Sequence, residues 1–289
     1  MNRILIKFSN TLKSVYYLII WGLKTIRNRG YKNYIIKEDH IENVYILGNG
    51  PSFNLALRTI KKSNNIKTCV VNFAILSPLF KEIKPNYYVI ADPAFFIKPT
   101  IDNRFKQVIK ELNKINWNMT IYIPYVYYNI IKLELSNSPY LNIIPFHTNA
   151  FHENMKFIKL KYFIYKLGLA CPRVQNVIIA SIYCMINTGY KNIQLYGVEH
   201  SWTLQIQVNK ENQVCLKDIH FYDKEKVTMT PWLKNNNEPF KMHEILRTLS
   251  YMFIGYHDLQ NYAKYLGNVN IINKTKDSFI DAFTKEYDY

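Results

Sequence analysis

The sequence predicts an α/β fold built on a mostly parallel sheet, with an inserted β-hairpin and lid region and an N-terminal amphipathic helix. From residue 43 onward, short runs of β-branched and aromatic residues alternate with helical patterns, which is typical of a parallel sheet. A period of two over residues 203–217 predicts the hairpin. The expected strands are 43–47, 68–73, 87–91, 120–124, 142–145, 192–196 and 268–272.

The order of these patterns divides the chain into four segments. Residues 1–40 are expected to form the amphipathic helix and a linker, and residues 41–200 the larger part of the α/β domain. Residues 201–240 would form the hairpin and a polar lid, and residues 241–289 a helix, a strand and a helix that complete the domain. Helical patterns cover residues 103–116, 174–188 and 241–266, and a terminal helix is expected at 278–283.

Residues 1–32 combine apolar and basic residues at helical spacing. The longest uncharged run, 14–23, is shorter than the roughly 20 apolar residues that span a bilayer. Two interpretations stay open. The helix lies on an anionic membrane, which gives peripheral membrane contact through residues 1–30, or it packs on the protein's own core or on a partner subunit. No small-residue cleavage site follows, so a signal peptide is not expected.

The formal net charge of +16 suits an anionic partner. The abundance of Ile, Asn, Lys and Tyr is also what an AT-rich bacterial genome encodes, so the charge need not serve a function. The basic residues are spread along the chain, and we therefore expect no nucleic-acid partner. The cysteines show no C-x-x-C spacing, which indicates neither a zinc site nor a disulfide framework and favours the cytoplasm: Cys69, Cys171, Cys184 and Cys215.

Glycines or polar residues follow four of the predicted strands, and ligands bind at the carboxyl ends of strands in parallel sheets. The first strand runs into the turn Gly48-Asn49-Gly50-Pro51-Ser52, and the others end at Asn72, Asp92 and 197–200. The glycines would let backbone N–H groups approach a ligand, although the turn matches neither G-x-G-x-x-G nor a P-loop. Each tip alone is as easily a structural turn. Four tips at one sheet edge favour a binding site.

Several of these motifs occur together with others in a fixed order. They are the Gly-Asn-Gly-Pro-Ser turn, Asn72, Asp92-Pro93 followed by Phe95-Phe96, Arg173 before a helix that leads to Gly189-Tyr190-Lys191, and Gly197-Val198-Glu199. In this order they resemble the bacterial sialyltransferases of glycosyltransferase family 42, over roughly residues 43–200. The resemblance implies a variant Rossmann-like fold with a lid. It also implies sugar transfer from a cytidine-monophosphate (CMP) donor, without a metal, by direct displacement with inversion.

Some positions depart from the family's pattern. Asp92 stands where the family has Asn, Gln175-Asn176 replaces a Thr-Ser pair, and Ser201 replaces a phosphate-binding tyrosine. The His200-Ser-Trp202, His220-Phe-Tyr222 and terminal Ile-Asp-Ala-Phe pieces look more like an uncharacterised branch found in bacterial surface-polysaccharide loci. The first turn also resembles the archaeal 6-hydroxymethylpterin diphosphokinases, for which the donor is ATP.

Direct displacement needs a base for the acceptor hydroxyl and groups that stabilise the departing phosphate. The family's base precedes its last helix, which favours His243, with His220 as the alternative. Tyr222, Asn49 and Arg173 would stabilise the leaving group. The predicted catalytic residues are therefore His243, His220 and Tyr222.

The resemblance assigns Asn49 and Asn72 to donor phosphate and ribose contacts. Asp92, Glu199 and His220 could instead bind Mg²⁺ through a substrate phosphate, but no D-x-D spacing supports a metal, so no metal or cofactor is expected. The predicted donor-binding residues are Gly48, Asn49, Gly50, Pro51, Ser52, Asn72, Asp92, Arg173, Gln175, Asn176, Gly197, Glu199, His200 and Ser201.

The leading hypothesis is an inverting glycosyltransferase at the cytoplasmic face of the plasma membrane. It would move a sialic-acid-like or other acidic sugar from a CMP donor to a lipooligosaccharide, capsule or other surface-glycan acceptor. The runner-up is a Mg²⁺-dependent diphosphokinase or other phosphotransferase, and the third hypothesis is a non-catalytic nucleotide-binding protein. The sequence leaves the sugar, the acceptor and a possible homo-oligomer open.

Overall fold

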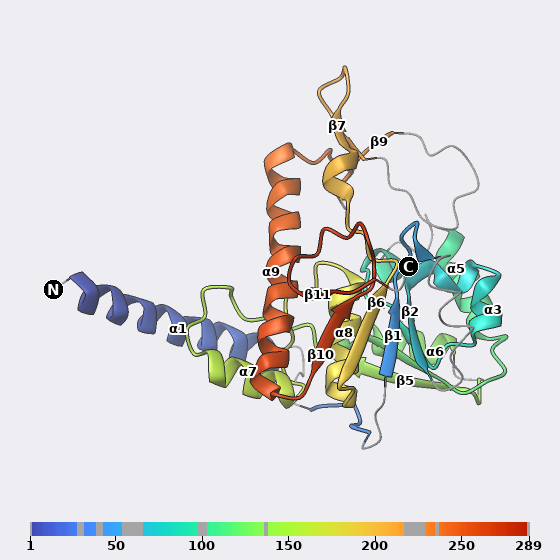
Figure 1. Cartoon of the computed structure of the whole chain (residues 1–289), viewed down its shortest axis with the longest axis horizontal. Coiled ribbons are helices and arrows are strands. Elements are labelled where there is room, and N and C mark those ends of the chain that lie inside the picture. Colours follow the sequence, from blue (N-terminus) through green and yellow to red (C-terminus); the bar gives the residue numbers. More distant parts are fainter. Residues whose placement is uncertain are drawn as a thin grey trace.

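The computed structural model describes residues 2–27, 32–38, 43–53, 66–97, 103–135, 138–216, 229–234 and 237–287. An eight-stranded parallel sheet lies at its centre, with helices on both faces (Figure 1). The strand order is β11-β10-β6-β1-β2-β3-β4-β5. The strands are β1 (Asn43–Leu47), β2 (Lys67–Val71), β3 (Tyr87–Val89), β4 (Met119–Pro124), β5 (Leu141–Phe146), β6 (Asn192–Tyr196), β10 (Asn270–Asn273) and β11 (Thr284–Lys285). The predicted α/β fold with a mostly parallel sheet is confirmed.

The strand order reverses at β1. β2 to β5 follow one another on one side of β1, whereas β6, β10 and β11 lie on its other side. Leu47 of β1 is in register with Val70 of β2 and with Tyr196 of β6, so the carboxyl ends of these three strands are level. Open α/β sheets bind ligands beyond the carboxyl ends of their strands at such a switch point.

Alternate side chains of β1 to β6 supply two separate hydrophobic cores. In β1, Val44 and Ile46 belong to one core, whereas Tyr45 and Leu47 belong to the other. The first core is covered by α7 (Ile158–Lys166), α8 (Val177–Thr188) and α9 (Met242–Leu266). The second is covered by η1 (Asn72–Leu76), α3 (Leu79–Ile83), α4 (Ala94–Ile97), α5 (Asn103–Leu112), η2 (Tyr125–Tyr127) and α6 (Tyr128–Glu134). Burial on both faces explains why the strands are apolar runs.

α8 is the central helix of the first face, and nearly all of its residues are buried. The side-chain oxygen of Asn176 caps its start by accepting hydrogen bonds from the N–H groups of Ile178 and Ile179. Gly189 ends it with a φ of 115°. α9 approaches α8 closely at Gly255, where an added Cβ would lie 2.8 Å from Ile179 Cδ1.

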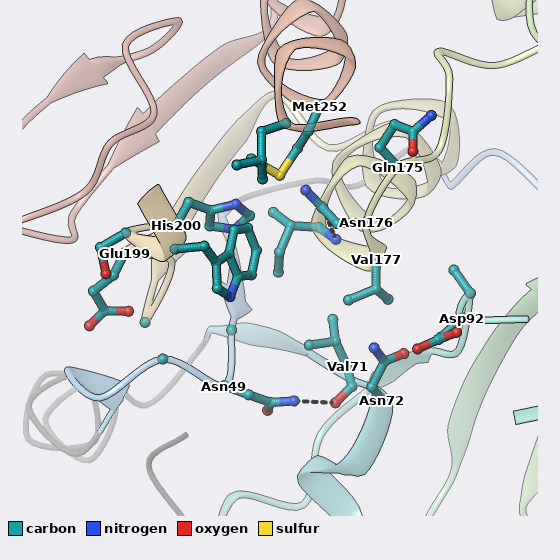
Figure 2. Close-up of a pocket in the computed structure, with 18 of the residues that line it drawn as sticks. Asn49, Val71, Asn72, Asp92, Gln175, Asn176, Val177, Glu199, His200 and Met252 are labelled. Carbon is teal, nitrogen blue, oxygen red and sulfur yellow. Dashed lines mark hydrogen bonds between the residues drawn. The ribbon is translucent and has the colours of Figure 1, made fainter. Parts of the chain in front are cut away.

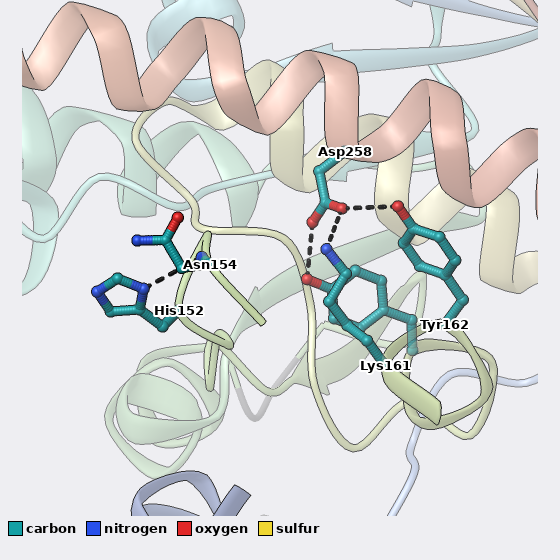
Figure 3. Close-up of polar contacts among 6 residues, drawn as sticks. His152, Asn154, Lys161, Tyr162 and Asp258 are labelled. Carbon is teal, nitrogen blue, oxygen red and sulfur yellow. Dashed lines mark hydrogen bonds and ion pairs between the residues drawn. The ribbon is translucent and has the colours of Figure 1, made fainter. Parts of the chain in front are cut away.

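A buried ion pair joins α7 to α9 (Figure 3). Lys161 Nζ donates to Asp258 Oδ1, and the side chains of the two residues are only 8% and 15% exposed. The hydroxyls of Tyr162 and Tyr165 also donate to the Asp258 carboxylate, at 3.0 and 2.9 Å. Both carboxylate oxygens are therefore satisfied, which is what a buried charge requires.

The predicted N-terminal helix is α1 (Asn2–Arg27), and Figure 1 shows it projecting from the body of the molecule. One face of its C-terminal half packs on residues 149–156. Ser14 Oγ accepts the N–H of Lys156 at 3.0 Å, and the ring of Tyr17 stacks on that of His152 at a centroid distance of 4.2 Å. None of the helices in the described ranges is both long enough and apolar enough to cross a membrane.

The predicted hairpin is formed by β7 (Ile206–Val208) and β8 (Val214–Leu216), and β9 (Thr230–Pro231) extends it into a small antiparallel sheet. The turn η3 (Trp202–Gln205) precedes it, so the first hairpin strand begins later than the predicted residue 203. Residues 217–228 and 235–236 of the predicted lid lie outside the described residues.

The terminal helix predicted at 278–283 is wrong. The segment is an irregular strap that folds over the end of β6 and leads into β11. Ser278 Oγ donates to the carbonyl of Val198 at 2.6 Å, and Ile280 is fully buried. Ile280 and Phe283 are therefore buried by tertiary contacts and not by a helical face, whereas Phe279 is exposed.

Candidate functional site

A cavity of about 420 Å³ opens at the carboxyl edge of the sheet, beside the switch point between β1 and β6 (Figure 2). Its walls come from the ends of β1, β2, β3 and β6, the start of α8, the middle of α9 and the small antiparallel sheet. Most of the predicted donor-binding residues line it, namely Gly48, Asn49, Gly50, Pro51, Asn72, Asp92, Gln175, Asn176, Gly197, Glu199, His200 and Ser201.

The glycines of the first turn let the tips of β1 and β6 touch. A Cβ on Gly48 would lie 2.3 Å from the carbonyl oxygen of Gly197, and a Cβ on Gly50 would lie 1.7 Å from Glu199 Oε2. Gly197 itself has a φ of 65°, which L side chains rarely adopt. Close packing of two strand tips therefore requires all three glycines.

Three backbone amides of this turn are engaged within the protein. The N–H of Gly48 donates to Tyr196 O at 2.8 Å, and that of Gly50 donates to Gly197 O at 2.9 Å. The N–H of Ser52 donates to Glu199 Oε1 at 2.6 Å. The turn's glycines were expected to bring backbone N–H groups close to a ligand, but those of Gly48, Gly50 and Ser52 join the turn to β6 and to Glu199 beyond it. A ligand beside the turn meets the Asn49 side chain and the Glu199 carboxylate.

Side-chain oxygens around the cavity are buried without a hydrogen-bond partner among the described residues: Asn49 Oδ1, Asn72 Oδ1, Glu199 Oε2 and Gln205 Oε1. Asn49 is held by a hydrogen bond from its Nδ2 to Val71 O at 3.3 Å, which sets the orientation of its amide (Figure 2). Buried polar atoms are nearly always hydrogen-bonded. These four acceptors indicate a ligand that brings hydrogen-bond donors.

Asn72 follows β2 with a φ of 45° and begins η1, so β2 ends at Val71, two residues before the predicted end. Asn tolerates a positive φ better than most residues. The Tyr88 hydroxyl donates to the Asn72 carbonyl and holds this bend. Figure 2 shows the Asn72 and Asp92 side chains pointing toward one another across the ends of β2 and β3.

The start of α8 forms the opposite wall, through Gln175, Asn176 and Val177. Besides capping α8, Asn176 donates from Nδ2 to the hydroxyl of Tyr256 on α9, at 2.9 Å. A helix N-terminus carries partial positive charge and favours anions. The described residues that line the cavity include no Lys or Arg, so the α8 terminus is the electropositive feature of that wall.

His200 is a buried histidine at the end of β6, with a φ of 52°. The Tyr256 hydroxyl lies 3.3 Å from each of its ring nitrogens, and the Trp202 ring packs edge-on at a centroid distance of 4.6 Å. Burial lowers the pKa of His200 to about 3, so the ring is neutral near pH 7. A neutral imidazole exchanges hydrogen bonds with a ligand without adding charge.

Three predicted residues are not brought to the cavity wall. His243 is exposed in the first turn of α9, and Arg173 is exposed with its guanidinium 4.0 Å from the centre of the Tyr251 ring. Ser52 contributes its amide to Glu199 but does not line the cavity. The predicted catalytic residues His220 and Tyr222 lie outside the described residues.

Other lining residues were absent from the predicted site. They come from η3, the small sheet and α9, and include Gln205, Trp232, Thr248, Leu249 and Met252. A rule based on strand ends does not detect helical residues, and the spacing of Thr248 and Met252 reads as an ordinary core face. The Trp in the His200-Ser-Trp202 motif was the available signal for an aromatic wall.

No group of three or more His, Cys, Asp or Glu side chains in the described part of the chain is placed to hold a metal ion. Asp92 and Glu199 both line the cavity, but the third member of the alternative Mg²⁺ set, His220, lies outside the described residues.

No protein-family model and no curated protein matches the chain. The chain is similar in structure to the sialyltransferase CstII from Campylobacter jejuni, solved in complex with the substrate analogue cytidine-5'-monophosphate. The TM-score is 0.38 and the sequence identity 13%, over 86% of each chain. A similarity at this level carries no conclusion about activity.

Proposed function

We propose that this chain is an inverting glycosyltransferase that takes an acidic sugar from a CMP-activated donor. The observation that carries the proposal is the convergence of four polar strand-end residues and the α8 N-terminus around one cavity at the switch point of a parallel sheet. The four residues are Asn49, Asn72, Asp92 and Glu199. The order of the sequence motifs, which resembles family 42, supports the same activity.

The cavity has one wall from the strand ends and an opposite wall from the start of α8, and their different chemistry orients the donor. Ribose hydroxyls and the cytosine amino group are hydrogen-bond donors, and they match the unpartnered oxygens of Asn49, Asn72 and Glu199. The phosphate and the sugar carboxylate are anions, which the carboxylates of Asp92 and Glu199 repel. The anionic part of the donor therefore lies toward Gln175 and the start of α8, and Ser201 and His200 bound the cavity beside the nucleoside.

The reaction is a direct displacement. The acceptor oxygen attacks the anomeric carbon, the bond from that carbon to the phosphate oxygen breaks, and CMP leaves with the electron pair while a base takes the acceptor's proton. By the resemblance to family 42, His243 or His220 is the base, and Tyr222 and Arg173 stabilise the leaving phosphate, although neither His243 nor Arg173 lines the cavity. The neutral His200 serves donor binding, since a pKa of about 3 makes it a poor base near pH 7.

The acceptor is a surface glycan, such as a lipooligosaccharide or a capsule chain on a lipid carrier, and transfer takes place at the cytoplasmic face of the plasma membrane. The net charge of +16 attracts the chain to such an anionic acceptor.

One observation favours a second function. Asp92 and Glu199 line a cavity in which no described lining residue is basic, and a carboxylate pair suits Mg²⁺ bound through a substrate phosphate. On this reading the chain is a Mg²⁺-dependent diphosphokinase or other phosphotransferase that uses ATP.

The test is CMP release from CMP-sialic acid by the full chain, with a lipooligosaccharide acceptor and EDTA present. We expect release above the spontaneous rate and its loss in either His243→Ala or His220→Ala, whichever removes the base, while CMP binding is retained. His257→Ala is the control, because His257 is 52% exposed and pairs with Asp281 outside the cavity. Retained release in both variants would overturn the mechanism. Turnover only with ATP and Mg²⁺ would establish the second function, and no turnover with either donor would favour a non-catalytic protein.

A further inference from the structure

α1 exposes a continuous stripe of large apolar side chains: Leu12, Val15, Tyr16, Ile19, Leu23 and Ile26. Successive members are one, three or four residues apart, and at about 100° per residue they fall on one side of the helix. Ile19 and Leu23, which are one turn apart, are 56% and 60% exposed. A contiguous apolar surface of this kind marks an interaction site.

The opposite side of α1 is fixed to the body, which turns the stripe outward. Ser14 and Thr25 are buried there, and Asn149 Nδ2 donates to Thr25 Oγ1 at 3.4 Å. The rings of Trp21 and Phe151 pack with their centroids 5.0 Å apart. Because these contacts use a different face, substitution of stripe residues leaves the attachment of α1 to the body in place.

The charge of α1 indicates which kind of partner contacts the apolar stripe. From Asn2 to Arg27 the helix has no acidic residue, and its basic residues are Arg3, Lys7, Lys13, Lys24 and Arg27. Pairing with α1 of a second copy would bring two cationic helices side by side, which electrostatic repulsion opposes. An anionic lipid surface supplies both the opposite charge and an apolar layer.

We propose that the stripe docks α1 flat on an anionic bilayer surface. The apolar side chains enter the boundary between headgroups and acyl chains, while Lys13, Lys24 and Arg27 stay at the level of the lipid phosphates. The opposite face of α1, which packs on the body, then holds the body of the protein at the membrane surface. This inference depends on α1 alone and not on the proposed transferase activity.

Sedimentation of the full chain with lipid vesicles tests the proposal. We expect binding to vesicles of phosphatidylcholine mixed with phosphatidylglycerol, weaker binding to phosphatidylcholine alone, and weaker binding at high salt. Ile19→Gln with Leu23→Gln lowers the bound-to-free ratio roughly tenfold or more, because two apolar side chains no longer leave water. Lys13→Gln with Lys24→Gln makes binding to the anionic vesicles more similar to binding to phosphatidylcholine alone.

The matched control places the same substitutions on another helix. Ile130 and Leu133 of α6 are 49% and 77% exposed, and Ile130→Gln with Leu133→Gln should bind vesicles as the unsubstituted chain does. All variants should keep their circular dichroism spectrum and thermal midpoint, since the changed side chains are exposed.

A site-specific label gives an independent reading. The four native cysteines are buried, so a polarity-sensitive dye attaches selectively to a cysteine introduced by Ile19→Cys. Its emission should shift to the blue when anionic vesicles are added, whereas the same dye at Leu133→Cys should not respond. The proposal is overturned if the unsubstituted chain does not bind anionic vesicles or if Ile19→Gln with Leu23→Gln binds them equally well. It is also overturned if sedimentation without lipid shows a dimer that these substitutions dissociate, because a second copy then covers the stripe.

Discussion

Glu199 occupies the space beside Gly50 that a Cβ would fill, and one of its carboxylate oxygens accepts the N–H of Ser52. The turn whose glycines were expected to bring backbone N–H groups close to a ligand therefore has a carboxylate against it. A negative charge at this place disfavours a phosphate and favours hydroxyl or amino groups. The glycine turn lines the cavity, but the reason for the glycines is the contact between two strand ends.

This contact predicts different outcomes at two neighbouring glycines. Gly50→Ala should lower the free energy of unfolding by about 1–3 kcal/mol, and by clearly less in a Glu199→Ala background, because part of the clash is with that side chain. Gly48→Ala should cost the same in both backgrounds, since its added Cβ would meet the backbone oxygen of Gly197 at 2.3 Å. Urea unfolding of these four variants, with the unsubstituted chain and Glu199→Ala as the two references, measures these costs. Equal costs for Gly50→Ala with and without Glu199 would contradict the packing described here.

His200 makes stability depend on pH. The unfolded state binds a proton near the ordinary histidine pKa of about 6.5, whereas the folded state does so only near pH 3. The free energy of unfolding should therefore decrease as the pH falls below about 6.5, by about 2 kcal/mol between pH 7 and pH 5 from this group.

The measurement is urea unfolding at both pH values in the unsubstituted chain and in His200→Asn, which tolerates the positive φ at this position. Between pH 7 and pH 5, the free energy of unfolding of the variant should decrease by about 2 kcal/mol less than that of the unsubstituted chain. An equal loss in both proteins would mean that His200 is protonated in the folded state near neutral pH.

The individual elements follow from the sequence to different degrees. The strands and α8 were predictable, because a strand buried on both faces and a helix buried all round leave clear apolar patterns. The terminal segment was not, since Ile280 is buried in the first core by tertiary packing and not by a helical periodicity of its own. The early end of β2 depends on the positive φ of Asn72, which no sequence pattern specified.

At the same scale, the contact between α7 and α9 depends on a buried charge pair. Asp258→Ala leaves Lys161 and the hydroxyls of Tyr162 and Tyr165 without their shared partner. The substitution should therefore lower the free energy of unfolding by about 3–5 kcal/mol. The double substitution Lys161→Met with Asp258→Ala should cost less than Asp258→Ala alone, because no uncompensated charge is then buried. Urea unfolding tests both, with Lys81→Ala as a control expected within about 0.5 kcal/mol, because Lys81 is 67% exposed in its pair with Glu111. A loss below about 1 kcal/mol in Asp258→Ala would contradict this contribution.

On the scale of the whole molecule, the net charge of the chain and the charge of the cavity wall have opposite signs. The chain carries a formal charge of +16, yet the described cavity wall holds Asp92 and Glu199 and no basic side chain. The strand-end residues predicted from the sequence line one cavity, because a parallel sheet brings its strand ends together. It did not predict the wall from α9 or the unpartnered oxygens, since both depend on how distant segments pack.

The most direct test of the proposed donor site is calorimetric titration of the full chain with CMP in the presence of EDTA. We predict one saturable site in the unsubstituted chain and affinity at least about tenfold weaker in Asn72→Gly, which removes a buried hydrogen-bond acceptor without straining the positive φ. Asn212→Gly is the matched control, since Asn212 has a φ of 55° in the hairpin turn away from the cavity, and its affinity should be unchanged. No binding of CMP, or equal affinity in all three proteins, would contradict the assignment of this cavity to a CMP-activated donor.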